Sequence, residues 1–114
     1  VYKRQIIYNG IIYNKVLIRF PPKNEFRANL AYGGKFIIKN ISSKQKNSLS
    51  EIAQYLKSNR IYLAGVDMIG DYITEINITS PSGIQEIDKA TNYDLSKNIS
   101  SQFSKIIQSS YKNA

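Results

Sequence analysis

The sequence predicts an α+β fold in which most strands of the sheet run antiparallel. Short runs rich in Ile, Val and Tyr occur in pairs joined by turn residues, which is the pattern of β-hairpins. Two segments have the apolar spacing of amphipathic helices, and these helices follow groups of strands instead of alternating with single strands. With 114 residues, the chain is one domain or part of one.

The first predicted hairpin spans residues 6–20, and its turn is Asn9-Gly10, a dipeptide typical of two-residue hairpin loops. Residues 21–34 are predicted to be a loop, because two prolines begin the segment, two glycines end it and no regular apolar spacing lies between them. Residues 35–41 have the composition of a short third strand.

A helix is predicted next. Ser48 and Glu51 have the spacing of a capping box, in which the serine caps the helix and the glutamate lies three residues further on. Ile52, Tyr55 and Leu56 then recur at helical spacing and predict one buried face.

The rest of the chain is predicted to form a second hairpin and a final helix. Its elements are, in order, a strand over 61–69, a turn at Gly70-Asp71, a strand over 72–79, a tight loop over 80–84 and a short segment over 84–90. Asp94 is predicted to cap the final helix. The apolar residues of this helix form a stripe that we interpret as packing, made of Leu95, Ile99, Phe103, Ile106 and Ile107.

Charge is distributed unevenly along the chain, which has a net charge of +8. Residues 1–60 hold twelve Lys and Arg against two acids, whereas residues 61–114 hold four against six. This asymmetry fits a nucleic-acid surface, a site where cations hold phosphates beside a carboxylate-bound metal, or simply a solvated basic surface. The chain has no Cys and no His, which excludes disulfides, disfavours zinc and excludes Ser-His or Cys-His catalysis within it.

The chain begins with the five residues VYKRQ and has no initial methionine. One reading frame of a common sequencing-library transposon end, GTG TAT AAG AGA CAG, encodes these residues. We therefore predict that residues 1–5 derive from an adaptor and that the gene fragment begins near Ile6; the alternative is that VYKRQ is native. In either case we expect residues 6–114 to be the C-terminal piece of a longer protein, because a domain rarely begins in mid-strand.

Two carboxylates and an amide lie in the otherwise apolar second hairpin, where a turn centred on Asp71 places Asp67 opposite Glu75. Asn77 points to the same face as Glu75, because alternate strand residues share a face. Like charges on cross-strand neighbours, with Cβ atoms about 5 Å apart, destabilise a sheet. A hard cation such as Mg²⁺ or Mn²⁺ resolves this conflict, since it prefers oxygen ligands and often completes its shell with phosphate oxygens. The alternative is that the carboxylates lie on different faces or at a solvated edge, each with its own cation.

The predicted loop carries groups suited to phosphate. Arg19 ends the strand before it, and the residues of interest that follow are Arg27, Asn29, Gly33, Gly34 and Lys35. Guanidinium groups and the bare backbone N–H groups of paired glycines bind phosphate oxygens. A loop anchored by proline and hinged by glycine can close over a site and exclude water. An exposed basic loop without a ligand is equally compatible with the sequence.

Both segments resemble bacterial glutathione synthetase, a ligase with an ATP-grasp fold. GVDMIGDYITEINITSPSGIQEI (65–87) is similar to that family's G-(L/V)-D-(I/M)-I-G-D-x-(L/I)-T-E-I-N-(V/I)-T-S-P motif and its continuation, and RFPPKNEFRANLAYGGK (19–35) is similar to its R-x-N-L-x-x-G-G loop. The E-x-N strand alone is common to many ATP-grasp enzymes, whereas the T-S-P continuation and the loop are specific. The resemblance covers roughly residues 6–90 and implies the C-terminal portion of an ATP-grasp domain.

The resemblance also implies an activity and roles for single residues. The activity is ATP-dependent joining of γ-glutamylcysteine to glycine, in which the cysteinyl carboxylate is phosphorylated and glycine's amine attacks the acyl phosphate. Asp67, Glu75 and Asn77 match the ligands of Mg²⁺ or Mn²⁺, and Arg19 matches an arginine near the transferred phosphoryl group. Asn77 and Lys35 are expected to contact ATP. The remaining matches lie in two loops: Arg27, Asn29, Gly33 and Gly34 in the loop that closes over the intermediate, and Ser80, Pro81, Ser82 and Gly83 at the peptide-substrate end.

Ala28 and Lys35 depart from the family, which usually has Gly and Arg at these positions. The family also has a Lys-Arg pair where Lys3 and Arg4 fall, but we leave Arg4 out of the predicted site because it lies in the expected adaptor. We expect this chain alone to lack ligase activity, because the substrate domain and the first part of the ATP-grasp domain are missing.

The expected partners of the whole enzyme are ATP, γ-glutamylcysteine and glycine, in a cytoplasmic homo-oligomer, a tetramer as in the family. No apolar run reaches the roughly 20 residues of a membrane helix, so we expect no membrane partner. An alternative is an ATP-grasp ligase with another acceptor. A second alternative is a small basic nucleic-acid-binding module, which predicts Tyr and Arg interleaved on a sheet face with few acids nearby; we favour a protein without a nucleic-acid partner.

Overall fold

The structure, a computed structural model, describes residues 2–20, 35–79 and 81–112. The elements in these ranges are, in order, β1 (Tyr2–Tyr8), β2 (Ile11–Ile12), β3 (Lys15–Phe20), β4 (Lys35–Asn40), α1 (Ser43–Ser58), β5 (Leu63–Ile69), β6 (Tyr72–Asn77), α2 (Ile84–Thr91) and α3 (Asp94–Lys112).

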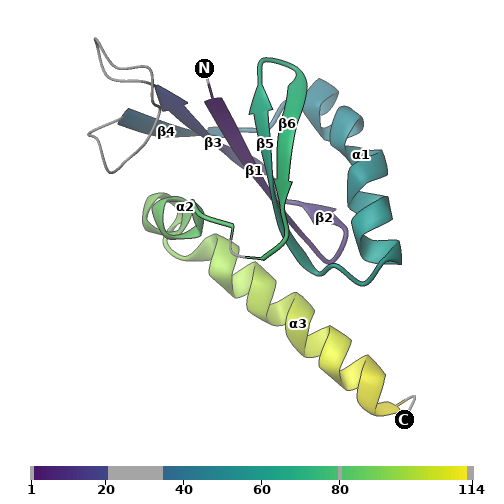
Figure 1. Ribbon diagram of the computed structural model, residues 1–114. Helices are drawn as coiled ribbons and strands as arrows, with labels where there is room; N and C mark the ends of the chain where they lie inside the picture. The colour runs from purple at the N-terminus through teal and green to yellow at the C-terminus, as the bar shows by residue number, and fades with distance from the viewer. Residues whose placement is uncertain (1, 21–34, 80, 113–114) are drawn as a thin grey trace.

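The described strands form one sheet with the order β4-β3-β1-β5-β6, and the short β2 pairs with β1 (Figure 1). Every strand pair in it is antiparallel. β1 lies at the centre, between β3 and β5, and β4 and β6 are the two edge strands. The predicted α+β class with an antiparallel sheet and flanking helices is confirmed.

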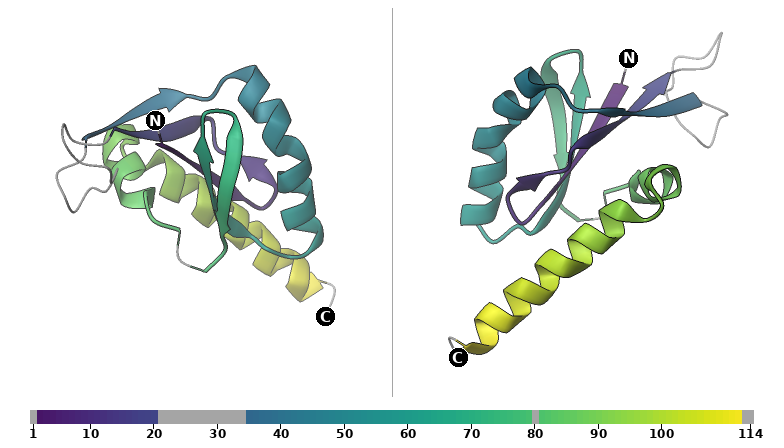
Figure 2. Two further views of the ribbon diagram at one scale, coloured as in Figure 1. Left: turned by 45° about the horizontal axis from the view of Figure 1, so that its top comes forward. Right: turned by 180° about the vertical axis from the view of Figure 1, so that it is seen from behind.

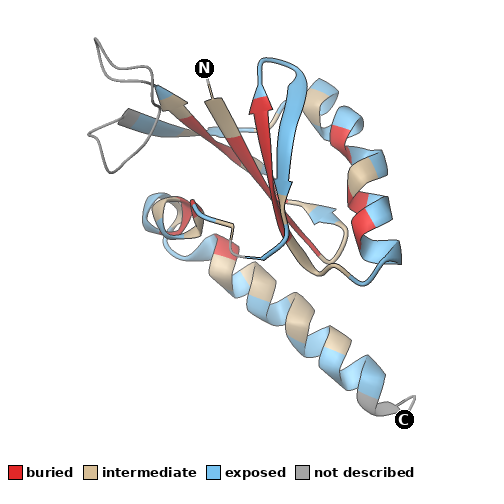
Figure 3. Cartoon of the chain, viewed as in Figure 1, coloured by how far each residue is buried: buried red, intermediate tan, exposed pale blue. Residues whose placement is uncertain are grey.

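Helices cover both faces of the sheet, as the two views of Figure 2 show. The face under α1, called the α1 face, has a buried core of Ile7, Leu49, Ala53, Leu56, Ala64, Val66 and Met68. The face under α2 and α3, called the α2 face, has a buried core of Ile6, Tyr8, Tyr13, Leu17, Ile87 and Leu95. The middle strands are therefore buried from both sides, whereas the edge strand β6 is almost entirely exposed (Figure 3).

The first hairpin starts earlier than predicted, and its second strand is divided. Asn9 and Gly10 have φ angles of 49° and 73°, the left-handed backbone that a two-residue type I′ turn requires. β1 begins at Tyr2 instead of Ile6 and pairs with β2 near the turn and with β3 further along. The register differs between these two pairings, because residues 13–14 interrupt the second strand.

α1 begins earlier than predicted, and Ser48 is not its cap. The cap is Ser42, whose hydroxyl accepts a hydrogen bond from the amide of Gln45 at 3.2 Å. Ser48 lies inside the helix, where its hydroxyl donates to the carbonyl of Gln45 at 2.8 Å. Ser42 and Gln45 have the same Ser-x-x-Gln/Glu spacing as the predicted pair, so the local pattern fits two starting points, and the structure has the earlier one.

The buried face of α1 is Leu49, Ala53 and Leu56. Of the three residues predicted for this face, Leu56 is buried, Ile52 is half-buried and Tyr55 is 66% exposed. The buried face begins at Leu49 and recurs at i+4 and i+7, which turns Tyr55 towards solvent.

The second hairpin brings Glu75 opposite Asp67, as predicted. Its turn contains only Gly70 and Asp71, which by themselves would place Thr74 opposite Asp67 and send Glu75 to the α1 face. A register shift at Asp67 corrects this, and the Thr74 hydroxyl donates to the Asp67 carbonyl there at 3.2 Å. The bulge therefore decides which face the second carboxylate occupies.

α2 and α3 are joined through the buried carboxylate of Asp88. The backbone amide of Ser96 donates to Asp88 Oδ1 at 3.0 Å, and the hydroxyl of Ser96 donates to Asp88 Oδ2. α3 begins at Asp94, so the prediction that Asp94 caps this helix is wrong; its carboxylate accepts a hydrogen bond from the Tyr13 hydroxyl at 2.9 Å. The residue before the helix is Tyr93, which has no short acceptor side chain, and Asp88 replaces the missing cap from the neighbouring helix.

The predicted packing stripe of α3 is buried only at its first end. Leu95 is fully buried and Ile99 packs on the same core, but Ile107 is 60% exposed near the other end of the helix. Figure 1 shows why, since α3 continues past the edge of the sheet. In the described part of the chain, no helix is both long enough and apolar enough to cross a membrane.

Replacing Asp88 is expected to weaken the start of α3. Asp88→Ala removes the acceptor for the Ser96 amide and should lower the free energy of unfolding by about 1–2 kcal/mol, the usual effect of losing a helix cap. Asp88→Asn keeps an acceptor oxygen and should lose less. Urea denaturation measures both, with the exposed Asp71→Ala as the control; equal effects at positions 88 and 71 would contradict the capping role.

Candidate functional site

A row of polar side chains, called the carboxylate row, crosses the middle of the sheet on the α2 face and consists of Arg4, Asp67 and Glu75. Arg4 of β1 pairs in register with Asp67 of β5, which pairs in turn with Glu75 of β6. In the next row of the same face, Tyr2 of β1 pairs with Arg19 of β3. Because residues directly opposite each other in an antiparallel sheet point to one face, four strands present these groups together.

Arg4 and Asp67 form a buried ion pair with two parallel hydrogen bonds. Arg4 Nε donates to Asp67 Oδ1 at 2.6 Å and Nη2 donates to Oδ2 at 2.7 Å. The two residues are only 6% and 3% exposed. Burial by itself would lower the pKa of Arg4, but the hydrogen bonds and charge of Asp67 outweigh it and raise the pKa above its usual value. The guanidinium therefore stays charged and balances the carboxylate.

The same guanidinium holds the segment that precedes α2. Arg4 Nη1 donates to the Ser82 carbonyl at 2.9 Å and to the Ser82 hydroxyl at 2.6 Å. This approach requires glycine on β5, because a Cβ at Gly65 would lie 2.9 Å from Pro81 Cβ and 3.4 Å from Arg4 Cδ. Gly83, with φ of 100°, then turns the chain into α2.

Tyr2 and Arg19 extend the cationic group. Arg4 Nη2 donates to the Tyr2 hydroxyl at 3.0 Å, and the Arg19 guanidinium carbon lies 5.5 Å from the centre of the Tyr2 ring. Burial, together with the neighbouring Asp67 carboxylate, raises the pKa of Tyr2 to about 12. Arg19 Nε is buried and has no hydrogen-bond partner among the described residues. A buried donor of this kind needs an acceptor, which an anionic ligand on this face would supply.

Glu75 and Asn77 lie on the edge strand, next to the buried pair. Glu75 is exposed and Asn77 half-buried, and Asn77 Oδ1 accepts a hydrogen bond from the Thr79 amide at 3.1 Å. The two carboxylates share a face, but the edge position of β6 leaves Glu75 in solvent while Arg4 neutralises Asp67. The sheet therefore tolerates the facing acids without a metal, which corresponds to the solvated-edge alternative.

The same donors also suit a hard divalent cation. Asp67, Glu75 and Asn77 offer only oxygen atoms, and the ranges that the structure describes contain no cluster of three or more His, Cys, Asp or Glu side chains. Two carboxylates and an amide leave much of a coordination shell open, which suits Mg²⁺ or Mn²⁺ bound jointly with phosphate oxygens. Both Asp67 oxygens already accept from Arg4, so a cation here must share this carboxylate with the guanidinium or displace it.

Five of the predicted site residues lie outside the described residues: Arg27, Asn29, Gly33, Gly34 and Ser80. Lys35 begins β4 and pairs with Phe20. Pro81, Ser82 and Gly83 lie against Arg4 and Gly65, so the structure joins the predicted substrate loop to the carboxylate row.

Arg4 and Tyr2 are the residues of the site that sequence reasoning missed. The match of Lys3-Arg4 to the family's Lys-Arg pair is the signal that points to Arg4, but the prediction that residues 1–5 derive from an adaptor excludes it from the predicted site. The structure places residues 2–5 in the central strand, whatever the origin of the DNA that encodes them; that origin stays a prediction.

Comparisons with known proteins agree with the motif. Residues 2–92 match the sequence model of the family described as "Prokaryotic glutathione synthetase, ATP-grasp domain". The chain is 36% identical to the glutathione synthetase of Prochlorococcus marinus over 105 residues, 92% of this chain and 34% of that protein. It is 34% identical to the Coxiella burnetii glutathione synthetase over 109 residues, 96% and 33% of the two chains. The Buchnera aphidicola glutathione synthetase is 43% identical over 94 residues, 82% and 29%. The chain thus spans about a third of the length of these curated relatives.

The Arg4–Asp67 pair is expected to show strong energetic coupling. Arg4→Met or Asp67→Leu alone leaves one buried charge uncompensated and should cost about 3–5 kcal/mol of unfolding free energy. The double variant should cost much less than the sum of the two, because no charge remains buried.

A double-mutant cycle by urea denaturation measures this coupling. The control cycle uses Lys44→Met and Asp71→Leu, since this exposed pair at 3.7 Å should couple by less than about 0.5 kcal/mol. Additive effects at positions 4 and 67 would show that the pair does not stabilise the fold as described.

Proposed function

Because the chain belongs to the prokaryotic glutathione synthetase ATP-grasp family, we propose that it is the metal- and phosphate-binding part of a ligase that joins γ-glutamylcysteine to glycine. One observation carries this proposal: two carboxylates and an amide share a sheet face with two arginines, one of which has an unpartnered buried donor. An ATP-dependent carboxylate-amine ligase needs these two kinds of group, to hold a divalent cation and to bind phosphate.

Asp67, Glu75 and Asn77 are the proposed ligands of Mg²⁺ or Mn²⁺. When bound, the cation would neutralise charge on the phosphate oxygens of ATP. Asp67 is held on a buried central strand and gives the site a fixed position, whereas Glu75 and Asn77 on the edge strand are open to a ligand that approaches from solvent. Asn77 and Lys35 are the proposed contacts to ATP.

The arginines would act on the transferred phosphoryl group. Arg19 points its unpartnered Nε into the same face and can donate to a phosphoryl oxygen. If a cation shares the Asp67 carboxylate, the N–H groups of Arg4 that now bind Asp67 can donate to the same phosphoryl group. Arg27 and the glycines Gly33 and Gly34 belong to the proposed closing loop, which would exclude water from a reactive acyl phosphate.

The proposed reaction has two displacements. The cysteinyl carboxylate attacks the terminal phosphorus of ATP and ADP leaves, which forms an acyl phosphate. The amine of glycine then attacks the acyl carbon, and inorganic phosphate leaves as the new amide loses its proton. Ser80, Pro81, Ser82 and Gly83 are proposed to lie at the peptide-substrate end, beside the guanidinium that Ser82 already contacts.

Binding of Mn²⁺ tests the proposed metal ligands on this chain itself. Added Mn²⁺ should broaden the amide NMR signals of residues 65–67 and 75–77, and Glu75→Gln should remove most of the broadening. Glu51→Gln, a matched loss of a carboxylate on the α1 face, should leave it unchanged. Broadening centred elsewhere, or equal in the two variants, would show that these residues do not form the cation site.

We propose that ligase activity requires more of the enzyme than this chain spans. We expect this chain alone to form no glutathione, because it spans about a third of its relatives. A chimera in which it replaces the matching third of the Prochlorococcus marinus glutathione synthetase should form glutathione from γ-glutamylcysteine, glycine and ATP, and Asp67→Asn or Arg19→Gln should reduce the rate at least 100-fold. Preference of the chimera for another amine acceptor would instead indicate a different ATP-grasp ligase, and activity of the chain alone would contradict the first expectation.

A further inference from the structure

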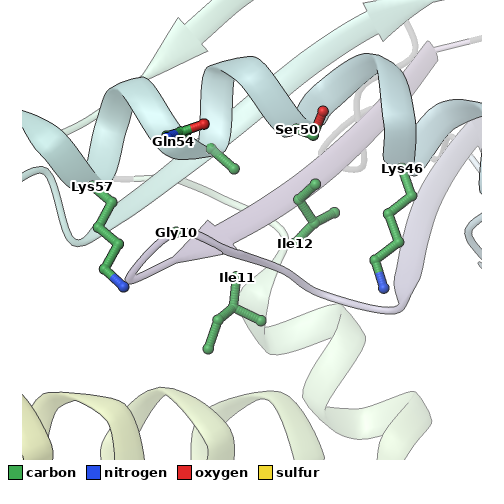
Figure 4. Close-up of a pocket in the computed structure, with 8 residues that line it drawn as sticks. Gly10, Ile11, Ile12, Lys46, Ser50, Gln54 and Lys57 are labelled. Carbon is green, nitrogen blue, oxygen red and sulfur yellow. The ribbon is translucent and has the colours of Figure 1, made fainter.

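A cleft on the α1 face, on the side of the sheet opposite the carboxylate row, lies between α1 and the first hairpin. Its volume is about 430 Å³, within the range of about 300–1,000 Å³ that is typical of small-molecule sites. The hairpin contributes Gly10, Ile11 and Ile12, and α1 contributes a single stripe of side chains that begins at Lys46 and ends at Lys57 (Figure 4).

The lining of the cleft carries two cations and no acid. Lys46 and Lys57 extend from α1 towards the hairpin at opposite ends of the cleft (Figure 4). Between them the side chain of Ile12 points towards α1, whereas that of Ile11 points away from it. Neither lysine forms an ion pair with any residue in the described ranges. The acidic residue of α1 is Glu51, which at 100° per residue lies roughly 120° around the helix from the centre of the stripe. Each of these two unpaired cations can bind an acidic group of a ligand that enters the cleft.

Lys57 is held in place by the turn of the hairpin. A Cβ at Gly10 would lie 2.8 Å from Lys57 Cδ and 3.1 Å from Lys57 Cβ, so the aliphatic part of this side chain lies flat against the glycine. A lysine with a packed stem loses less rotamer freedom when it binds a ligand than a free surface lysine does. The glycine that the type I′ turn needs therefore also orders one cation of the cleft.

The spacing of the two lysines sets the shape of a ligand. They are eleven residues apart on α1, which corresponds to about 16 Å along the helix axis before the side chains converge. Between them the cleft offers the apolar side chains of Ile12 and Ala53, and the polar groups of Ser50 and Gln54 lie along its helical wall. An elongated molecule with an acidic group at each end and an apolar middle matches this order of groups.

We propose that this cleft binds an elongated organic anion that carries one acidic group at each end, with Lys46 and Lys57 each holding one of them. The site is separated from the carboxylate row by the full thickness of the sheet, so this proposal does not depend on the proposed ligase function.

A titration of the ¹⁵N-labelled chain at constant ionic strength tests the proposal. The probe is suberate, a linear dicarboxylate, and octanoate of the same chain length is the comparison with one acidic group. Suberate should shift the amide signals of residues 10–12 and 46–57 in a saturable manner, and octanoate should bind at least five-fold more weakly. Lys46→Met and Lys57→Met, which keep the aliphatic stem and remove the charge, should each weaken suberate binding at least five-fold.

Lys44→Met is the matched control, because Lys44 lies on the same helix, is highly exposed and is absent from the lining of the cleft. Unchanged suberate binding in this variant supports the site. Equal weakening in all three lysine variants, shifts spread over the whole basic surface, or no saturable shift in the unaltered chain would overturn it. Circular dichroism of each variant shows whether α1 is intact. If Lys46→Met or Lys57→Met has an intact α1 and still binds suberate as tightly as the unaltered chain does, the proposal is overturned.

Discussion

The ion pair of Arg4 and Asp67 connects the parts of the molecule on which the proposed site depends. One guanidinium joins the central strand β1, the neighbouring strand β5 and the segment before α2, through bonds to Asp67 and Ser82. A charge buried this deeply is stable only with its partner. The pair therefore fixes which residues of β1 and β5 point to the α2 face, as well as the contact between the two strands. The approach of the segment before α2 also requires glycine at position 65, because a side chain there would collide with Pro81 and Arg4.

The proposed site combines a rigid half with an accessible half. β1 and β5 are covered by apolar cores on both faces, and Asp67 therefore has a well-defined position. Glu75 and Asn77 belong to β6, an edge strand of the sheet that the described residues form, so a ligand can approach this half of the site from solvent. In the proposed site, Asp67 on β5 would fix the position of a cation that bridges the two strands. Glu75 and Asn77 on β6 would leave the same cation accessible to the phosphates of a nucleotide. The edge position also explains how the sheet tolerates two facing acids when no metal is bound.

Local sequence patterns predicted much of this molecule before any contact was known. Asn9-Gly10 predicted a type I′ turn because few residues other than asparagine and glycine adopt left-handed backbone at low cost. Alternation along the second hairpin predicted that Glu75 shares a face with Asn77. The predicted pairing of Glu75 with Asp67 is also found, but it depends on the bulge at Asp67, which the turn does not specify. Turn chemistry and strand period act over a few residues, so they can be read from the chain itself. The match of the hairpin motif to a family added the chemistry that these patterns alone left open.

Tertiary contacts decided the rest, because several local patterns fit more than one structure. Ser48 has as good a capping spacing as Ser42, so the spacing alone does not decide between them, and in the folded chain Ser42 is the cap. Asp94 lies where a cap is expected, yet the cap comes from Asp88 on another helix. Arg4 reaches Asp67 across 63 positions of sequence, a distance over which no periodic pattern carries information. The sequence by itself determined the turns, the alternation along each strand and the family. Only the folded chain determined the register of the second hairpin, the group that caps each helix and the distant charge that Arg4 meets, because burial makes an unpaired group costly only after the segments have come together.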